Sequence, residues 1–154
     1  MAEQTSGAFD SSATQSAPTA TSVTTPPPAA ATPVSLTPQL LILEPFPVVR
    51  IRGTVLPRGA RVDLFSVRAP RGSRITVRCA GPCPKRRLAT TASGVTRLRP
   101  YERFLRAGVR LTLRVTRPAT IGKFTFVRIR SSRAPMRRDS CLAPGSAAPV
   151  SCPA

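Results

Sequence analysis

Apolar side chains alternate with arginine or threonine over several short stretches, and a period of two is typical of a strand with one buried and one exposed face. The alternation is clearest over residues 74–79 and 110–116, where the positions on one face are Ile75, Val77 and Cys79, and then Leu111, Leu113 and Val115. The 154 residues also include 18 Pro and nine Gly, which favour turns and oppose long helices. The pattern therefore predicts an all-β fold, a small antiparallel β-sandwich that is either Ig-like or barrel-like.

Weaker patterns predict further strands at residues 40–43, 49–55, 61–67, 95–98 and 124–130. Phe124 and Phe126 share one face of the last stretch. Its other face carries Val127 and Ile129, so we expect a central strand, with Phe126 packed under a loop. Residues 100–106 are expected to hold one helical turn.

Composition divides the chain into three parts. Residues 1–37 are mostly Ser, Thr, Ala, Pro and Gln, which bury too little apolar surface to offset the entropy of ordering, so we expect a disordered linker or stalk. Residues 38–131 hold the predicted strands and form the β-sandwich domain. Residues 132–154 carry no strand pattern and are expected to form an irregular tail closed by a disulfide.

Positive charge is confined to one part of the chain. All 24 Lys and Arg residues lie between Arg50 and Arg138, where the only acids are Asp63 and Glu102, so this stretch carries a net charge of +22. Such a field attracts polyanions. A GC-rich genome also encodes abundant Arg, Ala and Pro, and this is an equal explanation of the bias. The candidate polyanion-binding residues on or beside the predicted strands are Arg74, Arg78, Arg86, Arg87, Arg110, Arg114, Arg128 and Arg130.

The four cysteines are Cys79, Cys83, Cys141 and Cys152. An even number in a small, Pro-rich domain favours disulfides and an oxidising compartment. The turn between Cys79 and Cys83 can bring their Cα atoms within the ~4.4–6.8 Å that a disulfide needs. A flexible loop lets Cys141 and Cys152 close on each other. Of the three pairings open to four cysteines we predict these two.

The kinds and spacing of the chain's reactive side chains do not favour a metal site or a catalytic site. A four-cysteine zinc site is the rival interpretation, but only the first cysteine pair has the spacing of a zinc knuckle. The chain has no histidine, and Asp63, Glu102 and Asp139 stand singly, each expected to pair with a neighbouring arginine. We therefore expect no catalytic residue, no metal and no cofactor, and a protein that is not an enzyme.

The compartment follows from the cysteines and the ends of the chain. The longest apolar run, 40–43, is far shorter than the roughly 18 to 20 residues of a membrane span. Met1-Ala2-Glu3 lacks the basic start and apolar run of a secretory signal. Either an export signal lies upstream of Met1, or the protein is cytosolic with free thiols. We expect the first, and hence an extracytoplasmic location.

Six distinctive stretches lie between about Phe46 and the end of the chain: Phe46-Pro47-Val48-Val49-Arg50-Ile51, Val67-Arg68-Ala69-Pro70-Arg71-Gly72, Val77-Arg78-Cys79 with Cys83-Pro84, Val115-Thr116-Arg117-Pro118, Ile121-Gly122-Lys123-Phe124-Thr125, and Cys141-Leu142-Ala143-Pro144-Gly145-Ser146 with Cys152-Pro153. In these motifs the chain resembles an uncharacterised family of exported, arginine-rich, cysteine-stapled β domains of GC-rich bacteria. The resemblance implies an extracytoplasmic module downstream of a signal or membrane anchor. It implies no activity, so no functional residue is carried over.

These observations predict a non-enzymatic structural or interaction module, secreted or held on the cell envelope, whose basic surface binds acidic polymers. Its partner would be an acidic cell-surface polymer or an anionic lipid surface, and no small-molecule substrate is evident. The alternative is an intracellular nucleic-acid-binding β-barrel with reduced thiols. That function calls for aromatic residues interleaved with the charge, whereas the aromatic residues here occupy core-like positions.

Overall fold

The computed structural model describes residues 28–29 and 39–154, so nearly all of the predicted linker at 1–37 lies outside the described residues. Within the described part the elements are, in chain order, β1 (Leu41–Ile42), β2 (Val48–Leu56), β3 (Gly59–Arg68), β4 (Arg74–Ala80), β5 (Arg87–Thr91), β6 (Val95–Arg97), the 3-10 helix η1 (Arg99–Tyr101), β7 (Phe104–Arg106), β8 (Arg110–Thr116), β9 (Thr120–Arg130), β10 (Arg133–Leu142) and β11 (Pro149–Val150).

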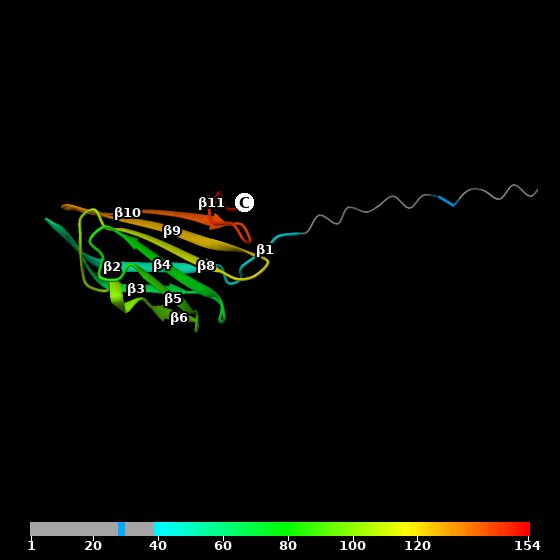
Figure 1. Ribbon diagram of the computed structural model, residues 1–154, viewed down its shortest axis with the longest axis horizontal. Coiled ribbons are helices and arrows are strands. Elements are labelled where there is room, and N and C mark those ends of the chain that lie inside the picture. The colour runs from blue at the N-terminus through cyan, green and yellow to red at the C-terminus, as the bar shows by residue number, and fades with distance from the viewer. Residues whose placement is uncertain (1–27, 30–38) are drawn as a thin grey trace, which may run out of the picture. The chain divides into compact units, whose positions relative to one another are not determined.

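The strands form two sheets that lie one over the other (Figure 1). The larger, seven-stranded sheet has the order β11-β10-β9-β8-β4-β5, with β1 also pairing with β9. The smaller, four-stranded sheet has the order β2-β3-β6, with β7 also pairing with β3. The pairing of β1 with β9 is parallel, and the other strand pairs are antiparallel. One of the sheets curls into a half-barrel, and the predicted all-β sandwich is confirmed.

The core lies between the sheets and consists of the side chains on one face of each alternating strand. Ile75 and Val77 of β4 are fully buried, and so is Val115 of β8. Within the core, Phe65 of β3 meets Tyr101 of η1 edge to face, with ring centroids 6.2 Å apart. Burying one Val, Leu, Ile or Phe side chain stabilises a fold by about 1.5–3 kcal/mol. The buried side chains of the alternating strands are therefore a large part of what stabilises the fold. The strongest sequence pattern therefore predicted the right strands and the right inner face.

The C-terminal part of the chain differs from the prediction. Residues 133–142 form β10, which pairs with β9, and β11 continues the same sheet, so the irregular tail is confined to the residues around them. The strand was missed because only Cys141 and Leu142 of β10 are buried, and its other side chains give no alternating apolar signal. In the segment 100–106, the predicted helical turn is the 3-10 turn η1, but Phe104–Arg106 forms strand β7.

Strand β9 is central, as predicted, with β8 on one side and β10 on the other. Val127 and Ile129 face the core, together with the buried side chain of Thr125. Phe124 and Phe126 therefore point to the outer face of the sheet, where both are half-buried. Phe126 shares a pocket with arginines of neighbouring strands and with Arg86 of the connection before β5, and the expectation that it packs under a loop stays a prediction.

Candidate polyanion-binding face

Exposed arginines line up on the outer face of the seven-stranded sheet, because side chains directly opposite on paired strands point to the same side. One row crosses five strands, from β5 to β10: Arg87, Arg78, Thr112, Phe126 and Arg138 are successive Cα partners. Adjacent strands lie about 4.8 Å apart, so this row spans roughly 19 Å. The row places cationic groups at both of its ends and an aromatic ring between them.

Neighbouring rows extend the same surface. Arg110 of β8 is the Cα partner of Arg128 on β9. Arg114 is the partner of Phe124, and its guanidinium carbon lies 5.9 Å from the centre of that ring, a cation–π contact. Arg74 begins β4 on the same side. We call this surface the arginine face, and its arginines are Arg74, Arg78, Arg87, Arg110, Arg114, Arg128 and Arg138.

The structure thus brings together six of the eight arginines named from the sequence. Arg86, just before β5, joins three of them, Arg78, Arg87 and Arg110, at a pocket in this face. Arg130, at the end of β9, donates two hydrogen bonds to the carbonyl oxygen of Ala134, at 2.9 and 2.7 Å, and is held by its own hairpin. Sequence reasoning missed Arg138 because β10 was not predicted, and it missed the outward orientation of Phe124 and Phe126.

A pocket of about 450 Å³ lies where β4, β5, β8 and β9 meet on the arginine face. We call it the arginine pocket, and it is lined by Arg78, Cys79, Ala80, Arg86, Arg87, Arg110, Thr112 and Phe126. Four arginines therefore line one opening, together with Thr112 and Phe126.

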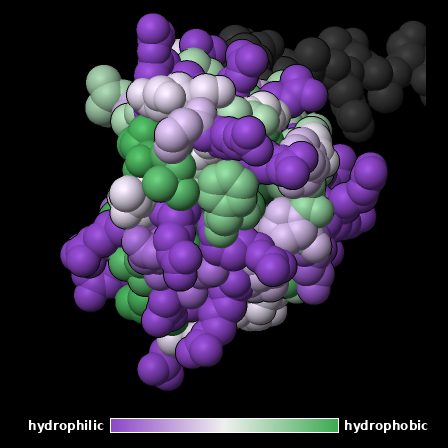
Figure 2. Space-filling model, turned by 90° about the vertical axis from the view of Figure 1, so that its left-hand side faces the viewer, coloured by the Kyte–Doolittle hydropathy of each residue, from purple (hydrophilic) through white to green (hydrophobic). Residues whose placement is uncertain are grey.

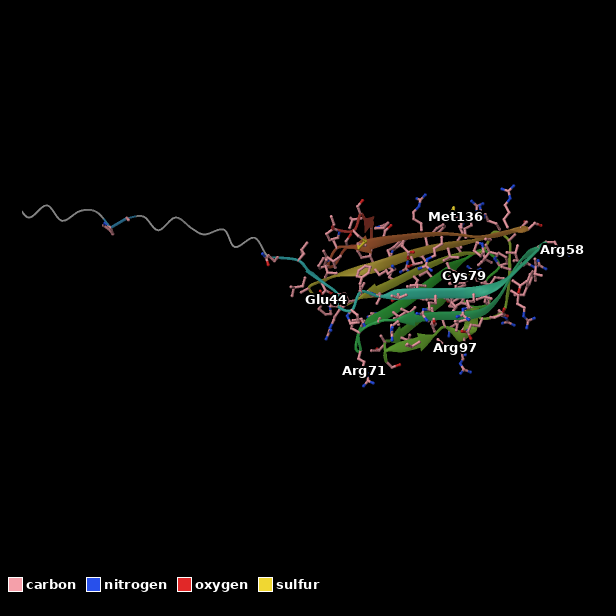
Figure 3. The ribbon with its side chains drawn as sticks, turned by 180° about the vertical axis from the view of Figure 1, so that it is seen from behind. Glu44, Arg58, Arg71, Cys79, Arg97 and Met136 are labelled. Carbon is pink, nitrogen blue, oxygen red and sulfur yellow. A yellow bond between two sulfur atoms is a disulfide. The ribbon has the colours of Figure 1, made fainter. Side chains whose placement is uncertain are left out.

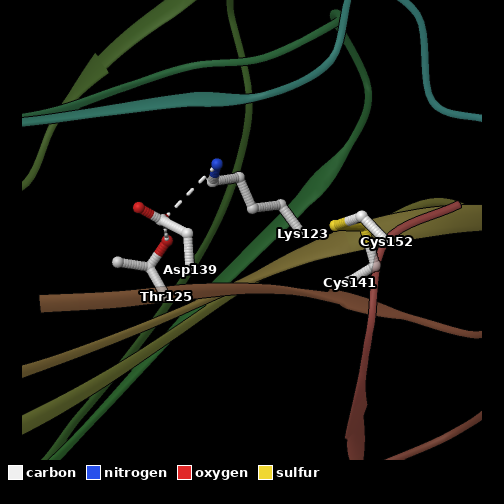
Figure 4. The surroundings of a disulfide bond; sticks show 5 residues. All are labelled: Lys123, Thr125, Asp139, Cys141 and Cys152. Atoms are coloured by element: carbon white, nitrogen blue, oxygen red, sulfur yellow. Dashed lines mark hydrogen bonds and ion pairs between the residues drawn. A yellow bond between two sulfur atoms is a disulfide. The ribbon is translucent and has the colours of Figure 1, made fainter. Parts of the chain in front are cut away.

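Both predicted disulfides are present, Cys79–Cys83 and Cys141–Cys152, with Cα atoms 6.0 and 4.9 Å apart. They leave no cysteine thiolate for the rival zinc site. The first disulfide closes the turn that follows β4, next to the arginine pocket. The second ties the end of the chain to the end of β10 (Figure 4).

The carboxylates of the described residues lie away from the arginine face. Asp63 lies 3.4 Å from Arg61, and Glu102 lies 2.8 Å from Arg97. Burial opposes ionisation of Glu102, but the Arg97 guanidinium and the Phe65 N–H hold the pKa of its carboxyl below the ordinary value.

Asp139 lies on the inner side of β10, between the two sheets' edges. Thr125 Oγ1 donates to Asp139 Oδ1 at 2.7 Å, and Lys123 Nζ lies 3.4 Å from the same oxygen (Figure 4). Arg137 Nε donates to Asp139 Oδ2 at 2.8 Å. Burial opposes ionisation of Asp139, but its hydrogen bonds and the nearby ammonium group hold the pKa of the carboxyl below the ordinary value. The predicted pairing of Asp63, Glu102 and Asp139 with nearby arginines is confirmed.

The arginine face is therefore a cationic surface without local counter-charge. In the part of the chain that the structure describes, no carboxylate lies within 4 Å of any of its arginines. Residues 39–154 contain all 24 basic residues and four acids, a net charge of +20. Hydrophilic side chains also cover most of the end of the sandwich seen in Figure 2, and Arg58 lies at that end in Figure 3.

A second cavity, of about 430 Å³, opens between the edges of β2 and β10 and is mostly apolar, with Ile51, Val62, Val127 and Pro135 in its wall. Arg52, Arg61 and Arg137 also line it, but Arg61 lies 3.4 Å from Asp63 and Arg137 donates to Asp139, so two of its three arginines have a carboxylate partner. Among the described residues, no three His, Cys, Asp or Glu side chains lie close enough to hold a metal ion. The same residues include no helix long and apolar enough to cross a bilayer.

Comparison of the chain with protein-family models, with curated proteins and with solved structures finds no match. The fold and the site themselves define the class: a two-sheet, all-β domain stapled by two disulfides, with a cationic outer face. Two disulfides in a domain of this size are typical of proteins that fold in an oxidising environment.

Proposed function

We propose that the protein is a non-enzymatic extracytoplasmic module, secreted or held on the cell envelope, whose arginine face binds acidic polymers. The observation that carries this proposal is the set of seven arginines on one face of five paired strands, with no carboxylate of the described residues within 4 Å of them. An extended anionic chain lying along the row can contact several guanidinium groups at once. Each contact releases a counterion, so the affinity falls steeply with salt.

The energetics of the sheet support a ligand for this face. Arg78 stands directly opposite Arg87, and Arg110 directly opposite Arg128. Like charges at opposed positions destabilise a sheet, and local arrangements that oppose folding are typical of functional sites. Genome composition alone enriches arginine everywhere, and it does not account for opposed pairs on one sheet.

The smaller sheet provides the contrast and a matched control. On its outer face Arg50 lies opposite Ser66 and Arg52 opposite Leu64, so neither faces another arginine on β3.

The test is the affinity of the full chain for dextran sulfate at 50, 100 and 200 mM NaCl. One variant, the face variant, replaces Arg78, Arg87, Arg110 and Arg128 by Gln. The matched control replaces Arg50, Arg52, Arg68 and Arg71 by Gln, so it loses the same charge from other parts of the surface. We expect the wild-type affinity to fall with salt, the face variant to bind more than about tenfold more weakly, and the control to stay near wild type. Equal losses in the two variants, or binding that salt does not weaken, would overturn the proposal.

The location is tested separately by the state of the cysteines. Support for it comes from the two disulfides and from the resemblance to exported arginine-rich β domains. Alkylation and mass spectrometry of protein from its native compartment should find no free thiol. Four alkylated cysteines would place the protein in a reducing compartment and refute the extracytoplasmic part.

One observation favours the alternative, an intracellular nucleic-acid-binding protein. Phe124 and Phe126 are half-buried on the arginine face, so aromatic rings are interleaved with the charge, and rings so placed can stack on bases. Short single-stranded oligonucleotides of different sequence discriminate the two functions. Sequence-dependent binding that is tighter than binding to dextran sulfate, together with free thiols, would favour nucleic acid.

A further inference from the structure

The four arginines of the arginine pocket come from β4, β5, β8 and the connection before β5, and backbone pairing fixes the position of each part. Arg78 and Arg87 are Cα partners on β4 and β5, and Arg110 lies on the adjoining β8. Arg86 belongs to no strand, but its carbonyl oxygen accepts a hydrogen bond of 2.9 Å from the backbone N–H of Cys79, whose disulfide closes the turn after β4. The connection that carries Arg86 is therefore fixed beside the other three.

Without a ligand, the four guanidinium groups repel one another around an opening of about 450 Å³. No carboxylate of the described residues lies within 4 Å of them. A bound anion offsets this repulsion because it attracts all four arginines. The attraction is stronger when the anion carries more negative charge in a small volume.

We propose that the arginine pocket binds a phosphomonoester group carried on a sugar or polyol unit of an acidic polymer, an inference that rests on the proposed polyanion-binding function. A phosphomonoester at neutral pH carries about −1.5 to −2 charges and three strong acceptor oxygens, so it can accept from three or more guanidinium groups together. A carboxylate carries one charge on two coplanar oxygens, and two guanidinium forks satisfy it. The number of cations in the pocket therefore matches phosphate.

The rest of the wall suits the carbon skeleton that carries the phosphate. The pocket volume falls in the range of about 300–1,000 Å³ that small-molecule sites occupy, and it exceeds what a bare ion fills. The half-buried ring of Phe126 offers an electron-rich surface on which the C–H edge of a sugar packs. The Thr112 hydroxyl supplies a further hydrogen-bonding group beside it.

The probes are glucose 6-phosphate, glucose 6-sulfate, glucuronate and inorganic phosphate, titrated calorimetrically into the full chain at constant ionic strength. We expect glucose 6-phosphate to bind about tenfold more tightly than glucuronate, and more tightly than inorganic phosphate. The second pKa of a phosphomonoester is about 6, whereas the four arginines that face the pocket stay charged. Affinity for glucose 6-phosphate should therefore rise between pH 5 and pH 7, and affinity for glucose 6-sulfate should not.

Two pocket variants complete the test. Arg78→Gln/Arg86→Gln should weaken glucose 6-phosphate binding about tenfold, whereas the control Arg50→Gln/Arg52→Gln, with the same loss of charge on the other sheet, should not. Phe126→Leu should remove the advantage of glucose 6-phosphate over inorganic phosphate. Equal affinities for glucose 6-phosphate and glucuronate, or equal losses in the two arginine variants, would overturn the inference. If dextran sulfate still binds in that case, the proposed function stands without it; if dextran sulfate fails too, both are wrong.

Discussion

The carboxylate of Asp139, on β10, helps to join the two sheets at the side of the sandwich where β10 lies beside β2. It holds Arg137 at 2.8 Å, and Arg137 Nη1 in turn donates to the carbonyl oxygen of Val49 on β2, in the other sheet, at 2.9 Å. The ion pair with Arg137 follows from their closeness in the sequence. The contacts of Asp139 with Thr125 and Lys123 could not be predicted, because they depend on the register between β9 and β10.

Asp139→Asn should destabilise the domain by about 1 kcal/mol at pH 7, since it removes charge-assisted hydrogen bonds at a partly exposed site. The pKa of Asp139 is lowered below 3.8 in the folded state, so its contribution is present above the unfolded pKa and is lost as the pH falls through the folded value. Urea unfolding should therefore show a smaller loss of stability between pH 5 and pH 2 in the variant than in the wild type.

Asp63→Asn is the matched control, because Asp63 makes one exposed ion pair, at 3.4 Å from Arg61. Such pairs are worth about 0–1 kcal/mol, and we expect a change near the lower end. Equal effects of the two substitutions would contradict the role of Asp139 in joining the sheets.

The strands that could be predicted are those whose inner face is continuously apolar, such as β4 and β8. Strands β5 and β10 were missed because they lie toward the edges of the sheet, where few side chains need to be buried. The same limit applied to the arginine face. Alternation shows which residues share a side of one strand, but only the register shows that Arg78 meets Arg87 and Thr112 meets Phe126.

The open edges of β2 and β10 carry features that discourage pairing with another chain. The register of β2 shifts between Arg52 and Gly53, and that of β10 shifts between Arg133 and Met136, a stretch that includes Pro135. Bulges and proline at an edge interrupt the row of backbone groups that an incoming strand would use. The apolar cavity between these edges is therefore protected against strand addition.

The two disulfides should have separable effects. Their loops enclose few residues, so removing Cys79–Cys83 should cost about 2 kcal/mol of stability and removing Cys141–Cys152 about 3 kcal/mol. Cys79→Ala/Cys83→Ala should also weaken glucose 6-phosphate binding, because it frees the connection that carries Arg86. Cys141→Ala/Cys152→Ala should leave that binding unchanged at temperatures where the variant is folded. Urea unfolding and calorimetry measure the two effects, and identical binding losses would contradict a positioning role for the first disulfide.

The charge of the molecule could be read from the sequence, but its distribution could not. Composition shows an excess of positive charge from Arg50 to Arg138, and both sheets carry exposed arginines. Only the sheet order reveals that the pairs Arg78/Arg87 and Arg110/Arg128 are both on the larger sheet. Two surfaces with similar arginine content therefore differ in how strongly their charges repel.

This difference predicts how the whole domain responds to salt. At 10 mM ionic strength charges interact over about 30 Å, and at 150 mM over about 8 Å, so salt should relieve self-repulsion and raise the Tm. Relief of about 1 kcal/mol corresponds to roughly 3–6 °C for a domain of this size.

The variant with Gln at positions 78, 87, 110 and 128 should have a higher Tm than the wild type at 10 mM salt and a weaker salt response. The control with Gln at positions 50, 52, 68 and 71 loses the same net charge but no opposed arginine pair. Its Tm should therefore rise less. Identical salt responses in the two variants would mean that total charge, and not its arrangement, governs stability. If the responses differ as expected, the opposed pairs Arg78/Arg87 and Arg110/Arg128 lower the stability of the folded domain, and binding of an acidic polymer to this face would relieve that repulsion.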